Sequence, residues 1–265
     1  MKDIERDIPP EGHLASVNGM EMYYEIHGEG SPLILLHGFT GSTQDWRSHI
    51  GELAEHYRTI PIDLRGHGWS TNPANEFTHR QAALDVFALM DHLGIDRFKA
   101  IGHSSGAMTL IHMATQQSER VEAMILVGST IYYTEEARAI QRQTTPETPI
   151  GGSSYQEELR EYHKHGDDQI RALWTQFHSF ADNYDDMNFT PPYLSTISAR
   201  TLIVHGDRDP FFPVSIPVEM YGAIPNSYLW IVPNWGHAIP SEHSEGFAAL
   251  FSETALEFLS EAWDE

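Results

Sequence analysis

The sequence predicts a doubly wound α/β fold, in which a mostly parallel sheet carries helices on both faces and a helical cap is inserted. Short all-apolar runs, typical of buried parallel strands, alternate with stretches of helical periodicity along the chain. Residues 102–106, Gly-His-Ser-Ser-Gly, stand between one such run and a helical stretch. The alternation then breaks after residue 130 and resumes at about residue 201, which indicates the insertion.

Each element follows from its local pattern. Asn18-Gly19 is a strong signal for a type I′ turn between antiparallel strands at 14–17 and 20–26. Apolar runs predict parallel strands at 33–36, 59–62, 98–101, 124–127, 201–204 and 228–232. Helices are expected between these strands, at about 43–57, 82–93 and 107–114, and from about residue 242 to the end.

The stretch from 131 to 195 holds no convincing core strand and is rich in aromatic residues. A featureless loop of that length is improbable inside a compact domain, so we expect a helical cap at 131–195 on an α/β core of 1–130 and 196–265. A pocket lining is expected from five aromatic residues, Tyr132, Trp174, Phe177, Phe180 and Trp235. The alternative is that the cap aromatics pack a small core of their own.

Composition limits the partners. The 265 residues carry 38 acidic and 16 basic side chains, a formal charge of -22 that repels nucleic acid and anionic membranes. Cysteine is absent, which excludes disulfides and thiol catalysis. No apolar run approaches the roughly 20 residues of a membrane span, and the charged N-terminus does not resemble a signal peptide. We expect a cytoplasmic protein that acts on a small molecule, without a cofactor or metal; its oligomeric state stays open.

The Gly-x-Ser-x-Gly pentapeptide indicates a nucleophile. A sharp turn between strand and helix lifts Ser104 out of the packing and aims the next backbone N–H at the same place. The flanking glycines allow the strand and helix to come close, where a Cβ would collide. The alternative is a glycine-rich turn that carries serines by chance.

A serine nucleophile needs a base and an orienting carboxylate. If the chain order is serine, acid, histidine, only His237 and His243 follow residue 209, and His237 lies just past the last predicted strand. We favour His237, because His243 is expected to open the final helix. The acid belongs on the loop after the 201–204 strand, where Asp209 is better placed than Asp207, which we expect to cap the turn or pair with Arg208.

Turnover also requires donors for the developing oxyanion. The turn supplies the Ser105 N–H, and the His37-Gly38-Phe39 loop after the 33–36 strand is expected to supply the N–H of Phe39.

Together these motifs make the chain resemble the α/β-hydrolase superfamily, in its capped serine-esterase and cofactor-free haloperoxidase-like branch. The resemblance rests on 37–39, 63–70, 102–106, 205–209 and 236–237. It implies a nucleophile at Ser104, an acid at Asp209 and a base at His237. It also implies a structural turn without catalytic role at 63–70.

The expected reaction is hydrolysis of a small to medium apolar carboxylic ester through an acyl-enzyme. Serine at position 104, in the turn between strand and helix, argues against the dehalogenase and epoxide-hydrolase relatives, which use aspartate there. The C–C bond hydrolases of the family usually carry Trp after Gly-His, whereas Ala238 follows here. C–C hydrolysis, lactone hydrolysis, a perhydrolase activity and a slow-turnover ligand receptor remain alternatives on the same fold.

Other histidines are read as structural. His163-Lys164-His165 with Asp167 and Asp168 could bind a metal, but we favour a solvated polar face. For His103 and His205, which flank the expected site, we favour packed and hydrogen-bonded side chains.

Overall fold

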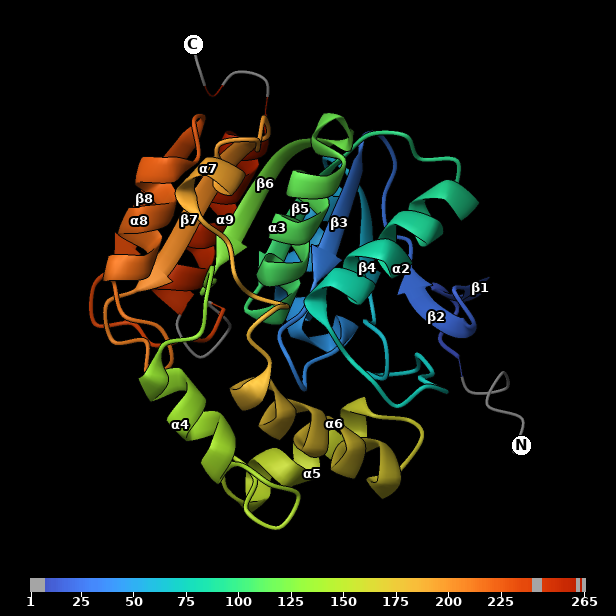
Figure 1. Ribbon diagram of the computed structural model, residues 1–265. Coiled ribbons are helices and arrows are strands. Elements are labelled where there is room, and N and C mark those ends of the chain that lie inside the picture. The colour runs from blue at the N-terminus through green and yellow to red at the C-terminus, as the bar shows by residue number, and fades with distance from the viewer. Residues whose placement is uncertain (1–7, 240–244, 261–262, 264–265) are drawn as a thin grey trace.

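The computed structural model describes residues 8–239, 245–260 and 263, and an eight-stranded sheet lies at its centre (Figure 1). The strand order is β1-β2-β4-β3-β5-β6-β7-β8. The β1–β2 and β2–β4 pairs are antiparallel, and the other five pairs are parallel. This confirms the predicted fold class. The strands are β1 (Gly12–Val17), β2 (Met20–Glu25), β3 (Pro32–Leu36), β4 (Arg58–Ile62), β5 (Phe98–His103), β6 (Val121–Val127), β7 (Arg200–Gly206) and β8 (Ser227–Val232).

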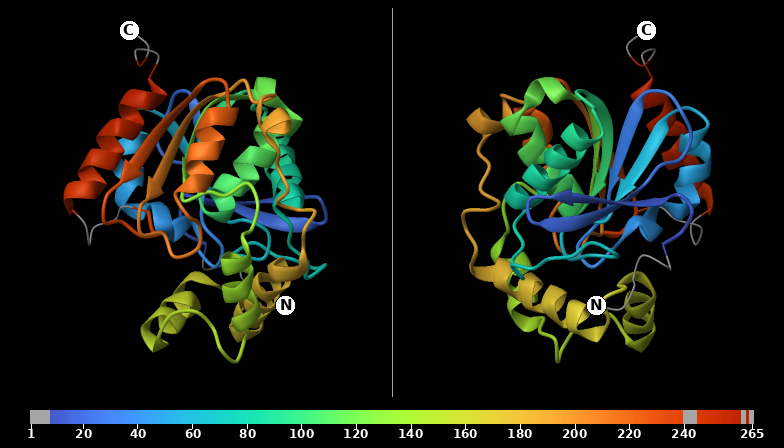
Figure 2. Two further views of the ribbon diagram at one scale, coloured as in Figure 1. Left: turned by 60° about the vertical axis from the view of Figure 1, so that its left-hand side comes forward. Right: turned by 90° about the vertical axis from the view of Figure 1, so that its right-hand side faces the viewer.

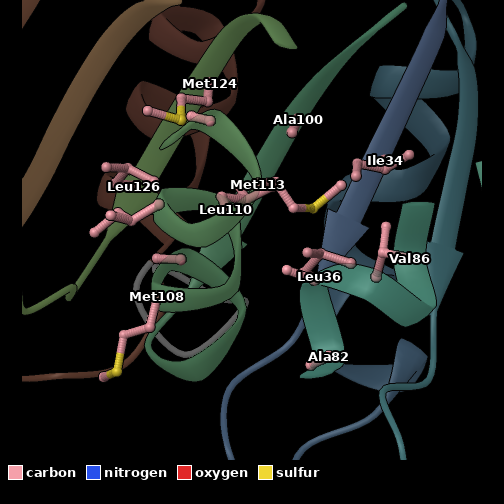
Figure 3. Close-up of a cluster of buried hydrophobic side chains, with 14 of the residues drawn as sticks. Ile34, Leu36, Ala82, Val86, Ala100, Met108, Leu110, Met113, Met124 and Leu126 are labelled. Atoms are coloured by element: carbon pink, nitrogen blue, oxygen red, sulfur yellow. The ribbon is translucent and has the colours of Figure 1, made fainter. Parts of the chain in front are cut away.

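The central strands are buried on both faces, which explains their uninterrupted apolar sequences. In β3, Ile34 and Leu36 point into one hydrophobic cluster, and Leu33 and Leu35 point into another on the opposite face. Figure 3 shows the first cluster, where residues of β3, β5 and β6 meet Met113 and its neighbours on the helix side.

Helices cover both faces of the sheet, as the two further views make clear (Figure 2). The helices α2 (His79–His92), α3 (Ser105–Gln116) and α8 (Ser215–Ala223) contribute to the first cluster. The helices α1 (Arg47–Ala54) and α9 (Glu245–Leu259) contribute to the second. The helix expected at 43–57 begins as a 3₁₀ turn at Thr43–Trp46, and the Ser42 side chain caps that turn by accepting a hydrogen bond from the Gln44 N–H. His243 lies outside the described residues.

The predicted hairpin turn is present. Asn18 and Gly19 have φ values of 45° and 76°, the left-handed conformations that a type I′ turn requires.

The 131–195 stretch is helical, with α4 (Glu135–Gln143), α5 (Ser153–Tyr162), α6 (Asp167–Ser179) and the short α7 (Pro191–Leu194). Figure 1 shows α4, α5 and α6 as a layer beyond the carboxyl ends of the parallel strands. The chain then returns along the sheet, where Met187, Phe189 and Leu194 are buried in the first cluster and α7 packs beside α8. The polypeptide therefore leaves the sheet after β6, crosses its carboxyl edge and rejoins it at β7.

Candidate active site

Ser104 occupies a strained turn between β5 and α3. Its φ of 49° and ψ of -114° lie in a region that L-residues rarely adopt. The two glycines are sterically required: a Cβ on Gly102 would lie 2.6 Å from the Ala107 nitrogen, and one on Gly106 would lie 2.2 Å from the Leu36 carbonyl oxygen. The turn therefore holds the serine side chain at the carboxyl edge of the sheet.

The structure brings Ser104, His237 and Asp209 into one hydrogen-bonded chain. His237, on the loop after β8, has its Nε2 2.8 Å from Ser104 Oγ. Its Nδ1 lies 2.6 Å from Oδ2 of Asp209, which follows β7. The Asp209 side chain is fully buried, whereas 18% of the His237 side chain is exposed. The three side chains thus form a hydroxyl–imidazole–carboxylate chain, the arrangement that a serine triad requires.

Asp209 is held as an anion. Burial alone would raise its pKa, but the hydrogen bond and charge of His237 and the N–H of Phe211 outweigh that effect, so the pKa is lowered. Its Oδ1 accepts backbone hydrogen bonds from Phe211 and Phe212 at 2.8 and 3.1 Å. Asp207 instead accepts from the Trp235 N–H at 3.4 Å and lies 3.8 Å from Arg208, away from His237.

The two flanking histidines are packed and hydrogen-bonded. His103 Nε2 lies 2.7 Å from the His237 carbonyl oxygen, and His205 Nε2 lies 2.9 Å from that of Phe212. Burial lowers the pKa of both, that of His103 to about 3, so both rings are neutral near pH 7. Their contacts hold the loop that carries His237 and the loop that carries Asp209.

The two expected oxyanion donors border the same cavity as Ser104. Ser105 is the first residue of α3, so its N–H lies in the first turn, where no intrahelical carbonyl is available. The loop with Phe39 is held by hydrogen bonds of His37. His37 Nε2 accepts the Leu64 N–H at 2.9 Å, and His37 Nδ1 lies 2.7 Å from the Gly38 carbonyl oxygen.

The 63–70 turn provides that support. The Asp63 carboxylate accepts hydrogen bonds from the Thr43 N–H at 2.7 Å and the Trp69 N–H at 2.8 Å. Gly68 passes so close to it that a Cβ there would lie 1.9 Å from Oδ2. The 63–70 turn thus has a structural role: it supports the loop that carries Phe39.

A cavity of about 300 Å³ opens over Ser104 between the sheet edge and the helical layer. Trp174, Phe177 and Phe180 line it, as expected from the sequence. The lining also includes residues that the sequence analysis did not select, namely Met108, Tyr133, Ala137, Gln141, Ile150, Tyr155, Phe211 and Phe212. Phe211 and Phe212 follow Asp209 by two and three residues on the same loop, which is a signal that could have found them.

Tyr132 and Trp235 do not border this cavity. The Tyr132 hydroxyl reaches outward to Glu219 of α8, at 3.1 Å. The Trp235 ring packs on Phe247 of α9, and its Nε1 donates to the Ala238 carbonyl oxygen at 2.8 Å. Both expectations are corrected for the same reason: each side chain finds a partner on a helix of the core, Tyr132 on α8 and Trp235 on α9.

A second, more polar hollow adjoins the first and shares Gly38, Phe39 and Tyr155 with it. Asp45, Arg47 and Glu158 lie in its wall. Burial and the nearby carboxylates of Asp63 and Glu158 raise the pKa of Asp45 to about 7. This hollow therefore has an acidic character.

The histidines of the 163–168 segment make hydrogen bonds to the backbone of neighbouring loops. His163 Nδ1 accepts the Gly68 N–H, and its Nε2 lies 3.0 Å from the Thr40 carbonyl oxygen. His165 Nε2 lies 3.0 Å from the Trp69 carbonyl oxygen. Within the residues that the structure describes, no group of three or more His, Cys, Asp or Glu side chains is arranged to hold a metal ion. Over the same residues, no helix is long and apolar enough to cross a membrane.

Comparison with known proteins agrees with the fold. The family model described as "alpha/beta hydrolase fold" matches residues 31–148. A soluble epoxide hydrolase of Corynebacterium sp. (strain C12) is 40% identical over 115 residues, which cover 43% of this chain and 40% of that protein. The 2-hydroxy-6-oxo-6-(2'-aminophenyl)hexa-2,4-dienoic acid hydrolase of Metapseudomonas resinovorans is 27% identical over 95% of this chain and 91% of its own.

Among solved structures, a serine hydrolase involved in carbazole degradation superimposes with a TM-score of 0.75 at 26% identity. That match covers 94% of this chain and 98% of the other.

The parallel sheet, the serine turn at its carboxyl edge and the matched sequence define a class of hydrolases. The chain has the α/β-hydrolase fold, and its residues 31–148 match the model of that family.

Proposed function

We propose that this protein is a serine hydrolase that cleaves small to medium apolar carboxylic esters through an acyl-enzyme. The observation that carries the proposal is the 2.8 Å contact between Ser104 Oγ and His237 Nε2 at the floor of an apolar cavity. In this proposal Ser104 is the nucleophile, His237 the base and Asp209 the residue that orients it, with the N–H groups of Phe39 and Ser105 as the oxyanion hole.

The reaction proceeds in two halves. Ser104 Oγ attacks the ester carbonyl carbon while its proton passes to His237 Nε2, and the Asp209 carboxylate stabilises the imidazolium. The N–H groups of Phe39 and Ser105 donate to the oxyanion. The intermediate collapses, the C–O bond breaks, and the leaving alkoxide takes the proton from His237. Water, deprotonated by His237, then releases the acid and restores Ser104.

The helices of 131–195 act as a cap in this proposal. The α4 and α6 side chains close the cavity above Ser104, and Trp174, Phe177 and Phe180 supply the apolar contact for the acyl or alcohol group. Water is thereby kept from the site except as the second reactant.

The acidic second hollow favours a neutral ester over an anionic dienoic acid of the kind named for the relative from Metapseudomonas resinovorans. Two acidic side chains, Asp45 and Glu158, and one basic side chain, Arg47, line this hollow. A carboxylate placed there would be opposed by Glu158 and by the ionised fraction of Asp45. C–C hydrolysis and lactone hydrolysis use the same three residues and are therefore the second candidates.

The test is a panel of nitrophenyl and alkyl esters, a lactone and a vinylogous diketone, followed by mass spectrometry after an organophosphonate. We expect many turnovers per site on esters, one phosphonate adduct on Ser104 and loss of turnover in Ser104→Ala. A matched pair within one loop tests the acid: Asp209→Asn should reduce kcat at least a hundredfold, and Asp207→Asn should leave it within a few-fold.

Other outcomes assign the alternatives. Faster turnover of the lactone or diketone would replace the ester as substrate while keeping the three residues. A single slow event with large thermal stabilisation would favour a ligand receptor. An adduct on another serine, or full activity of Ser104→Ala, would overturn the proposal.

A further inference from the structure

Gln141 is a buried amide in the wall of the cavity over Ser104. It lies on α4 one turn beyond Ala137, and both residues line the cavity. Only 3% of Gln141 is exposed, and its buried Oε1 has no hydrogen-bond partner. An unpaired polar atom of this kind costs about 1–3 kcal/mol, so its retention next to a binding cavity needs a reason.

Three other polar side chains in this wall come from α5, from α6 and from the segment just before α4. Each has a hydrogen-bond partner within the protein. The Tyr155 hydroxyl pairs with Thr40 Oγ1 at 2.7 Å, and the Trp174 Nε1 donates to Gln156 Oε1 at 3.3 Å. The Tyr133 hydroxyl donates to the Met108 sulfur at 3.5 Å. Gln141 is therefore the polar group of this part of the wall that is left to interact with a ligand.

The backbone of α4 is fixed, so the Gln141 Cα stays in this wall. Arg138, three residues earlier, is buried and donates to the Ala181 and Phe180 carbonyl oxygens at 2.7 and 3.2 Å. Thr134 caps the start of the helix by accepting the Ala137 N–H. The rings of Phe177, Phe180 and Trp174 make the rest of this wall apolar.

We propose that Gln141 is a specificity-determining residue that binds a hydroxyl group on the substrate, remote from the scissile bond. The proposal rests on the proposed function and deepens it: the substrate is an ester whose apolar portion carries a hydroxyl. A hydroxyl both donates to an amide oxygen and accepts from an amide N–H, so it satisfies the side chain in either orientation of the amide. An apolar group at the same place leaves the buried amide unpaired, and a site built for a hydroxyl discriminates against such a group.

The test uses paired substrates. Nitrophenyl esters of ω-hydroxyalkanoic acids of increasing chain length, and of a hydroxyphenylpropanoic acid, are each compared with the analogue that carries methyl in place of hydroxyl. We expect one pair in which the hydroxyl raises kcat/KM at least tenfold. The hydroxyl-to-methyl ratio is the kcat/KM of the hydroxyl substrate divided by that of its methyl analogue. In Gln141→Leu this ratio should fall by at least tenfold, mainly because the methyl analogue is turned over faster and the hydroxyl substrate more slowly. Gln141→Met provides a second apolar variant of similar length.

Gln176 provides the matched control. It is a buried glutamine on α6 with an unpartnered Oε1, but its amide N–H binds Asn75 Oδ1 at 3.1 Å and it lines a different hollow. Gln176→Leu should leave the hydroxyl-to-methyl ratio unchanged. An equal ratio in wild type and both Gln141 variants would overturn the proposal.

Binding provides a readout that does not depend on turnover. The hydroxy acid products should raise the melting temperature of wild type and of Ser104→Ala more than their methyl analogues, and Gln141→Leu should abolish the difference. If no ester is hydrolysed but this difference appears, the proposed reaction fails while the hydroxyl site stands. If esters are hydrolysed without any hydroxyl preference in rate or binding, the hydroxyl site fails alone.

Discussion

His79 Nε2 lies 3.0 Å from Ser105 Oγ, and Nδ1 of the same ring lies 2.7 Å from Asp186 Oδ2. All three side chains are buried. The Asp186 carboxylate also accepts the backbone N–H groups of His79 and Arg80, at 2.9 and 3.1 Å. This network ties the returning end of the 131–195 stretch to the residue whose N–H is the proposed oxyanion donor. Sequence reasoning missed it, because its members lie 26 and 107 positions apart and no motif marks them.

His79→Phe should lower the free energy of unfolding by about 3–5 kcal/mol, because it removes the nearer of two histidines beside a buried carboxylate; His112 lies 3.7 Å from it. Burial would raise the pKa of Asp186, but His79 and the backbone donors lower it, so the carboxylate is charged in the folded state. Urea unfolding measures the change. The double variant His79→Phe/Asp186→Asn should lose less than the sum of the two single variants.

The exposed His92 on the same helix is the control, and His92→Phe should change stability by less than about 0.5 kcal/mol. Strict additivity in the double variant would show that the His79–Asp186 contact contributes nothing of its own.

Stability should fall as the pH falls below about 6.5, the pKa of histidine in an unfolded chain. Burial lowers the pKa of several folded histidines, to about 3 or 4 in most cases, so the unfolded chain binds more protons between about pH 4 and 6.5. Two carboxyl groups, Asp45 and Asp63, have pKa values raised to about 7 by burial and oppose the trend. The histidines outnumber them: His37, His67, His103, His112 and His163.

His163→Gln separates one contribution, because its pKa is lowered to about 4 by burial. Between about pH 4.5 and 6, the slope of unfolding free energy against pH should decrease by up to about 1.4 kcal/mol per pH unit, the equivalent of one proton. Denaturant titrations across this range measure the slope. An unchanged slope would mean that His163 is already protonated in the folded protein.

Gly106→Ala should destabilise the protein and disable the site together. The new Cβ would meet the Leu36 and His37 carbonyl oxygens at 2.2 and 2.7 Å, so α3 must move away from the strand that leads to Phe39. Overpacking of this kind costs about 1–3 kcal/mol. We also expect kcat on esters to fall at least tenfold, because the two proposed oxyanion donors lie on the two elements forced apart.

The control is the same substitution in open space. Gly51 lies inside α1, and a Cβ there meets nothing within 4 Å. Gly51→Ala should raise stability by up to about 1 kcal/mol, because alanine is the better helix former, and leave kcat unchanged. Thermal melts and ester kinetics of the pair check both signs, and a neutral Gly106→Ala would contradict the steric argument.

The sequence by itself determined the sheet, its helices and the short list of residues that could form the site. The hydrophobic periodicity of strands and helices is a local property of the sequence. The apolar runs 33–36 and 98–101 therefore predict buried strands whichever segments pack against them. The choice of His237 and Asp209 also followed from chain order and loop position, and the structure brings both to Ser104.

Tertiary structure alone decided which side chains face the cavity and which are paired. Tyr132 and Trp235 look as suitable as Trp174 in sequence, yet each turns to a core helix because a partner stands there. Gln141 has no sequence signal, because its property is the absence of a partner in a packed wall. Such features depend on contacts between segments distant in the chain, and local pattern carries no information about them.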